Sequence, residues 1–152
     1  MLIKYTTTNT KETQKLGQDF AKEILKISLK NPLNHKAIVL ALYGNLGGGK
    51  TTFLQGFAKG LGVKEKVLSP TFVVMKRFTS PGKGSNFYHF DCYRLKDEND
   101  VLELGWNEIV SNQKNIVAVE WPERIKKVLS KNIIKINFKV AGENNREITF
   151  KM

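Results

Sequence analysis

A glycine-rich segment at residues 44–53, GNLGGGKTTF, constrains the fold of this chain more than any other feature. The run AIVLALY (residues 37–43) precedes it and is apolar throughout, as expected of a strand buried on both faces of a sheet. A segment with apolar residues at helical spacing follows it, from Thr51 to Leu61. A glycine loop between such a strand and such a helix turns successive N–H groups toward an anion at the helix N-terminus. The order therefore predicts a cradle for phosphate.

The loop fits the pattern G-x-x-x-x-G-K-[ST] at each of its fixed positions. We expect Lys50 to reach the outer phosphates of a nucleotide and the Thr51 hydroxyl to ligate Mg²⁺. The predicted nucleotide contacts in the loop are Gly44, Asn45, Leu46, Gly47, Gly48, Gly49, Lys50, Thr51 and Thr52. The alternative is a glycine-rich turn that binds no ligand, and the flanking strand and helix argue against it.

A magnesium site of this kind also needs an acid at the end of an apolar strand, and two residues compete for that role. Glu120 follows IVAV (residues 116–119), whose uniformly apolar composition predicts a central strand parallel to the one before the glycine loop. Asp91 follows FYHF (residues 87–90), whose alternation predicts a peripheral, antiparallel strand. We therefore assign the metal to Glu120 with Thr51, and expect Asp91 to orient the metal or the attacking water. The structural alternative for Asp91 is an ion pair with the nearby arginine or a lysine.

Several single residues allow two interpretations. Thr71, in the sequence Ser-Pro-Thr-Phe, is either a sensor of the γ-phosphate acting through the metal or part of a plain turn into the next strand. Trp121, next to the predicted metal acid, is either a contact of the nucleotide or a core residue, as lone tryptophans more often are. Cys92 has no neighbouring base in the sequence and is expected to be buried and inert. His35 and His89 are too far apart in the sequence to suggest a metal site.

The rest of the chain predicts one α/β domain over residues 1–152, with a mixed parallel and antiparallel sheet flanked by helices. Thr10 is the predicted cap of a helix that runs to about Lys30 and stops at Asn31-Pro32. The further predicted elements are strands at 72–78 and 86–93, antiparallel to each other around a turn at 81–84, short helices at 97–104 and 122–129, and a closing hairpin of 133–140 and 146–152.

Composition limits where the protein works and what it binds. No apolar run approaches the roughly 20 residues that cross a membrane, and the N-terminus lacks the pattern of a signal peptide. The single cysteine excludes a disulfide framework and a cysteine-rich zinc site, so we expect a reducing cytoplasm. The net charge of +11 favours a polyanionic partner. However, 21 of the 25 basic residues are lysines scattered along the chain, as a compositional bias of the whole proteome would also produce.

Motifs of other nucleotide-binding proteins are missing. The sequence has no N-K-x-D segment, which recognises guanine in ordinary GTPases, and no arginine-rich lid, which many small kinases carry. Arg94 and Arg124 are isolated, so we expect no arginine of this chain to point at the phosphates. These absences predict slow hydrolysis by the chain alone.

Four segments together resemble the TsaE (YjeE) family of small bacterial P-loop ATPases: GNLGGGKTT, SPTF, YHFDCYRL and VEWPER. The residues to which this resemblance gives a nucleotide or metal role are Lys50, Thr51, Thr71, Asp91, Glu120 and Trp121. The loop departs from the family pattern at Asn45 and Gly48, neither of which adds a large group to the cradle. Cys92 stands where the family has leucine, which is a change of packing.

The resemblance also implies a function. The family takes part in making N6-threonylcarbamoyladenosine (t6A) at position 37 of tRNA, which implies a Mg²⁺-dependent ATPase that acts with the partner proteins TsaD and TsaB and resets their complex. tRNA is then met through that complex, and the chain alone is expected to be a monomer or to self-associate weakly. Two rivals stay open. One is a small P-loop kinase, which needs a phosphate acceptor. The other is a non-enzymatic tRNA-binding module, which the net charge of +11 suggests.

Overall fold

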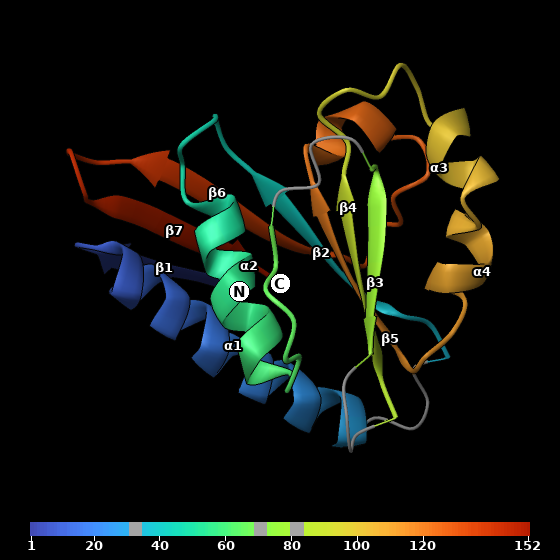
Figure 1. Ribbon diagram of the computed structural model, residues 1–152, viewed down its shortest axis with the longest axis horizontal. Coiled ribbons are helices and arrows are strands. Elements are labelled where there is room, and N and C mark those ends of the chain that lie inside the picture. The colour runs from blue at the N-terminus through green and yellow to red at the C-terminus, as the bar shows by residue number, and fades with distance from the viewer. Residues whose placement is uncertain (31–34, 69–72, 80–83) are drawn as a thin grey trace.

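Seven strands form one mixed sheet in the computed structural model, which describes residues 1–30, 35–68, 73–79 and 84–152 (Figure 1). In their order across the sheet, the strands are β1 (Leu2–Thr7), β7 (Arg146–Lys151), β6 (Ile134–Val140), β2 (Ile38–Tyr43), β5 (Asn115–Glu120), β4 (Asn86–Asp91) and β3 (Met75–Thr79). The helices are α1 (Thr10–Lys30), α2 (Lys50–Gly60), α3 (Asn99–Glu103), α4 (Trp106–Val110) and a 3₁₀ turn, η1 (Pro122–Ile125). The predicted α/β fold with a mixed sheet flanked by helices is confirmed.

The centre of the sheet is parallel. β5 lies between β2 and β4 and runs parallel to both, and β6 is parallel to β2 on its other side. Every residue of β5 is buried, which confirms the prediction of a central strand beside the one that precedes the glycine loop. Because parallel strands end at the same edge of a sheet, the segments that follow β2, β4 and β5 meet there.

The prediction for β4 was right about its antiparallel neighbour, β3, and wrong about its place at the periphery of the sheet. β4 pairs antiparallel with β3, as predicted, but it also pairs parallel with β5 and therefore lies inside the sheet. The alternating pattern suggested a solvent face because it contains a histidine. That residue, His89, is fully buried because Glu120 of β5 binds it.

Helices cover the two faces of the sheet unequally (Figure 1). α1 and α2 pack side by side on one face, where they bury Leu42, Ile136 and Phe150 of three different strands. α3, α4 and η1 pack on the other face over the parallel strands, where Trp106 joins Val119 in a second core. The parallel centre is thus buried from both sides, as its apolar composition requires.

Glycines let α1 and α2 approach closely. A Cβ on Gly56 of α2 would lie 1.9 Å from the carbonyl oxygen of Gln14 on α1. A Cβ on Gly60 would lie 2.5 Å from another α1 carbonyl oxygen, and one on Gly17 of α1 would lie 2.2 Å from the Phe53 carbonyl oxygen. No side chain fits at these distances, so the backbones of the two helices are in direct contact.

The start of the chain differs from the prediction. β1 was not predicted, because its sequence LIKYTT buries only its last residue, Thr7, and edge strands need little apolar content. Asn9, not Thr10, caps α1: the Asn9 side-chain oxygen accepts the N–H of Glu12 at 2.9 Å, and Thr10 is the first helical residue. The predicted stop at residues 31–32 lies outside the described residues.

Other boundaries also moved. β3 begins at Met75 rather than at residue 72, which lies outside the described residues together with most of the predicted turn at 81–84. The predicted helix at 122–129 is only the short turn η1, and α4 was missed because five residues are too few for a helical period to repeat. None of the described helices is long and apolar enough to cross a membrane.

Replacing Gly56 with alanine tests the helix contact. In an exposed helix this change would favour folding by up to about 1 kcal/mol. Here the added carbon meets backbone that cannot move aside, so we expect the free energy of unfolding to fall by at least about 2 kcal/mol. Urea unfolding measures the change, with Lys59→Ala on the exposed side of α2 as the control. A Gly56→Ala protein as stable as the control would show that α1 and α2 can separate at no cost.

Candidate functional site

The glycine loop joins the buried end of β2 to the first turn of α2. Gly49 precedes α2 in the left-handed conformation (φ 98°), and Gly48 donates its N–H to the Asn45 carbonyl oxygen at 3.0 Å. A Cβ on Gly44 would lie 2.6 Å from the Phe138 carbonyl oxygen of β6, so this position needs glycine both for its φ of 143° and for space. The loop therefore curls over the sheet edge as its sequence pattern predicts.

A cavity of about 590 Å³ opens beside this loop. Its lining includes loop residues 45–52 together with Asp91, Glu120 and Trp121 from the ends of β4 and β5. The structure thus brings together most of the predicted site residues. Gly44 is not part of the lining, and Thr71 lies outside the described residues.

The ammonium group of Lys50 lies at the centre of the site. It donates to the carbonyl oxygens of Gly44 and Asn45 and lies 4.1 Å from the ring centroid of Trp121. Lys50 is only 5% exposed. Burial lowers the pKa of Lys50, while the nearby carboxylates, first that of Glu120, oppose this shift. No described carboxylate lies within 4.0 Å of the ammonium group, so this buried cation is held by dipoles and a ring instead of an anion.

Glu120 and Asp91 lie side by side where two parallel strands end. They are register partners across β5 and β4, and Glu120 is only 3% exposed. Thr51, in the first turn of α2, donates its hydroxyl to the Glu120 carboxylate, at 3.2 Å and 3.4 Å from the two oxygens. The first turn of α2 and the end of β5 are therefore already connected through these two side chains.

His89 is a site residue that the sequence analysis missed. Its Nε2 lies 2.7 Å from a carboxylate oxygen of Glu120, and the ring is fully buried. Nδ1 has no hydrogen-bond partner among the described residues, so Nε2 makes the polar contact that holds the ring. His89 is the register partner of Ala118, two residues before Glu120, so the two side chains are diagonal neighbours on one face of the sheet. The sequence did show that His89 and Asp91 lie on the same face of one strand. It could not show that this face meets Glu120, because that depends on the parallel pairing of β4 with β5.

Trp121 continues from β5 in a conformation that few residues other than glycine adopt. Its φ of 58° and ψ of 52° are left-handed, and it is the only non-glycine residue with positive φ among those described. The ring faces Lys50 and lies 5.0 Å, centroid to centroid, from the ring of Tyr93. Backbone strain of this kind is characteristic of functional sites. Trp121 is partly buried: it lines the cavity and also packs against the second core, so both interpretations of this residue hold in part.

Comparison with known proteins identifies the family of this chain. The family model described as "Threonylcarbamoyl adenosine biosynthesis protein TsaE" matches residues 7–148. The chain belongs to the TsaE family. Among curated proteins of that name, the one from Bacillus subtilis is 38% identical over 97% of this chain and 84% of its own length. The one from Rickettsia typhi is 33% identical over 97% of this chain and 93% of its own length.

A solved structure agrees with the fold. The crystal structure of YdiB from Bacillus subtilis superposes on this chain with a TM-score of 0.72 and 32% sequence identity. The match covers 99% of this chain and 84% of YdiB. The resemblance to the TsaE family is thus confirmed by sequence over most of the chain and by the arrangement of its elements.

Two arginines, Arg94 and Arg146, line the cavity of this TsaE chain, although the sequence led us to expect no arginine aimed at the site. Arg94 follows β4, and Arg146 begins β7 at the far end of the sequence. Nη1 of Arg146 donates to three carbonyl oxygens of its own hairpin, the closest being that of Asn145 at 2.9 Å. Sequence alone could not place Arg146, because only the pairing of β7 between β1 and β6 brings it to the loop.

The N-terminus of α1 also lines the cavity, through Asn9, Thr10 and Thr13. Cys92, as predicted, is fully buried. Burial, followed by the nearby acidic side chains, raises the pKa of its thiol to about 12, so the thiol stays protonated and unreactive at neutral pH.

Removing the imidazole of His89 tests the buried pair. His89→Leu leaves a carboxylate without one of its donors, and we expect the free energy of unfolding to fall by about 1.5–3 kcal/mol. His89→Gln keeps an N–H donor and should recover most of that loss. Urea unfolding at pH 8 makes the comparison, and equal stability of the leucine variant and the unchanged protein would contradict this role.

Proposed function

We propose that this chain binds ATP with Mg²⁺ beside the glycine loop and hydrolyses it as a step in forming t6A in tRNA. The names of the family and of the relatives support the tRNA modification. The observation that carries nucleotide binding is the buried ammonium group of Lys50, which faces the cavity and has no anionic partner within 4.0 Å among the described residues. A nucleotide phosphate is the anion that a loop of this shape accepts.

The donors at the end of β5 fit Mg²⁺. The Thr51 hydroxyl and the Glu120 carboxylate lie 3.2 Å apart and are both oxygen ligands of the kind that Mg²⁺ prefers. No three His, Cys, Asp or Glu side chains in the described part of the chain are grouped as a metal cage would need. A nucleotide-bound Mg²⁺ needs fewer, since phosphates and waters supply the other ligands. Bound there, the ion would neutralise charge on the β- and γ-phosphates.

The protein groups would then act on the phosphates and the water. Lys50 would exchange its loop carbonyl partners for phosphate oxygens, and the N–H groups at the start of α2 would stabilise the same negative charge. Asp91, opposite Glu120 in register, would orient the attacking water. Thr71 would couple the state of the γ-phosphate to the partner-binding surface.

The side of the cavity formed by α1 and the closing hairpin is our candidate for the nucleoside. Its lining includes Asn9, which precedes α1, and Thr10, the first residue of α1. Asn144 and Arg146 of the closing hairpin also line it. Trp121 is already engaged with the Lys50 ammonium at the phosphate end, so we place the base away from it. A volume of about 590 Å³ lies within the range of small-ligand sites.

Slow hydrolysis by the chain alone still fits this proposal. Arg146 lines the cavity, but its Nη1 is held by carbonyl oxygens of its hairpin. We infer that the partner proteins TsaD and TsaB complete the site, and that ATP hydrolysis resets their complex between rounds of modification.

ATP hydrolysis with and without TsaB–TsaD is the direct test. We expect the partners to raise the rate. Glu120→Gln and Lys50→Ala should each lower the stimulated rate by about 10²–10³-fold, because each removes charge stabilisation at the reacting phosphate. Lys59→Ala, exposed on the same helix, is the matched control and should keep full activity. Absence of stimulation together with a fully active Glu120→Gln protein would overturn the proposal.

Tryptophan fluorescence tests nucleotide binding without turnover. Phosphates that draw the Lys50 ammonium away from the ring of Trp121 should change the emission of that residue. The other tryptophan, Trp106, is 2% exposed in the core and should contribute a constant signal. We expect Mg·ATP to change the emission, and Trp121→Phe to lose the response. A response that survives in Trp121→Phe would place the nucleotide elsewhere.

A further inference from the structure

Over part of its width, one face of the sheet is covered by none of the helices that the structure describes. β1, β7 and β6 carry α1 and α2 on one side (Figure 1). Alternate residues of these strands, on the other side, are exposed or partly exposed. We call this surface the open sheet face. Its polar residues are Lys4, Thr6, Lys135, Asn137, Lys139, Glu147, Thr149 and Lys151, and the apolar Leu2 lies on its edge strand.

Positive charge on the open sheet face exceeds negative charge. Four lysines share it with one acid, Glu147, which forms an ion pair with Lys4 at 2.8 Å. The Lys4 ammonium, and to a smaller extent that of Lys139, lowers the pKa of Glu147. The carboxylate of Glu147 therefore compensates the charge of Lys4 and part of the charge of Lys139. It does not compensate the other two lysines of this face.

Lys135 and Lys151 are left without compensation. They are register partners, directly opposite each other on neighbouring antiparallel strands, where like charges destabilise a sheet. Neither has an ion-pair partner among the residues that the structure describes. A sheet that keeps two ammonium groups in this position has a surface suited to an anion.

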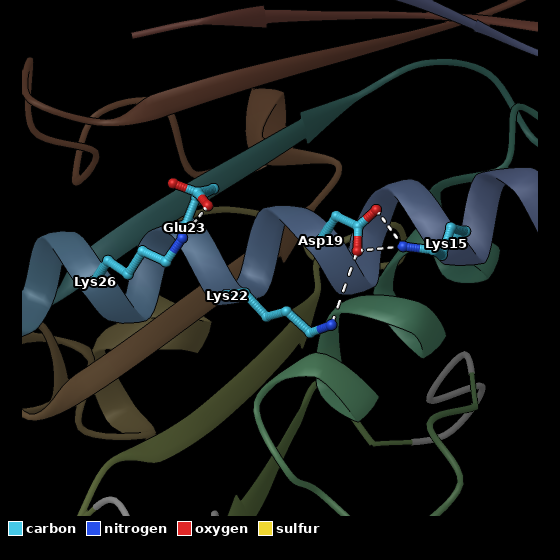
Figure 2. A network of polar contacts seen from close by, with 5 residues as sticks. All are labelled: Lys15, Asp19, Lys22, Glu23 and Lys26. Atoms are coloured by element: carbon cyan, nitrogen blue, oxygen red, sulfur yellow. Dashed lines mark hydrogen bonds and ion pairs between the residues drawn. The ribbon is translucent and has the colours of Figure 1, made fainter.

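Three lysines of α1, Lys15, Lys22 and Lys26, show the opposite arrangement (Figure 2). Lys15 and Lys22 lie 2.6 Å and 3.9 Å from a carboxylate oxygen of Asp19, and Lys26 lies 2.7 Å from Glu23. These three ammonium groups therefore share two carboxylates, which compensate most of their charge within the helix. The lysines behind the net charge of +11 are thus spread along the sequence, but those without a nearby carboxylate gather at particular places on the surface.

We propose that the open sheet face binds the phosphate backbone of RNA, and that this RNA is tRNA. Lysine, asparagine and threonine side chains are the donors that commonly contact backbone phosphates. A protein partner is less suitable, because lysine is depleted at the centre of protein interfaces and this face has no apolar centre. The choice of tRNA among RNAs rests on the proposed function. The binding of RNA to the open sheet face does not require ATP binding or hydrolysis.

Fluorescence anisotropy of an unmodified tRNA transcript with the full chain tests the proposal. We expect Lys135→Gln/Lys139→Gln/Lys151→Gln to weaken binding at least 10-fold and to reduce the slope of log K against log salt by about 2 to 3, close to 0.9 per lost phosphate contact. The matched control removes three charges from α1, as Lys15→Gln/Lys22→Gln/Lys26→Gln, and should weaken binding less than 3-fold. The sheet variant should fold normally, because it removes a repulsive pair, and its melting temperature checks this.

Several outcomes would overturn the proposal. These are equal effects of the two triple variants, no tRNA binding by the unchanged protein at low salt, or equally tight binding to phosphatidylglycerol vesicles with the same dependence on the sheet lysines. Lys50→Ala separates this proposal from the ATPase proposal. It should abolish hydrolysis and leave tRNA binding intact, so each can fail while the other stands.

Discussion

The parallel pairing of β5 with β2 on one side and β4 on the other is the constraint on which the site depends. It brings three chain segments to one sheet edge: the glycine loop after β2, Asp91 at the end of β4, and Glu120 at the end of β5. Burial of every β5 residue secures this arrangement, because a slip of one residue would turn Glu120 to the other face and move it away from Thr51.

The two buried charged side chains at this sheet edge, Glu120 and Lys50, are held by different kinds of group. Glu120 accepts from a hydroxyl and an imidazole, whereas Lys50 donates to loop carbonyls and faces a tryptophan ring. The two charges do not pair with each other within 4.0 Å, although both are almost fully buried. Keeping them apart leaves room for a charged ligand between them, whereas a closed ion pair would have neutralised the site.

Local patterns predicted the parts of the site that are contiguous in sequence. The glycine loop, Lys50, Thr51 and the acid after IVAV could be named because loop geometry and apolar runs are local properties. The β4 direction, the Glu120–His89 pair and the position of Arg146 could not be, because each depends on which strands become neighbours. Short elements such as α4 and the edge strand β1 escaped for a different reason, since neither is long or apolar enough to show a period.

The glycine contact between α1 and α2 has a consequence for how the cavity can move. Both helices begin at the cavity, α1 with Asn9 and Thr10 and α2 with Lys50, and their backbones touch along their length. Helices in such contact cannot slide or tilt independently, so one wall of the cavity is a rigid body that includes the phosphate loop. Any opening or closing of the cavity must therefore move other parts of its lining, such as Val73 and Tyr93, relative to this body.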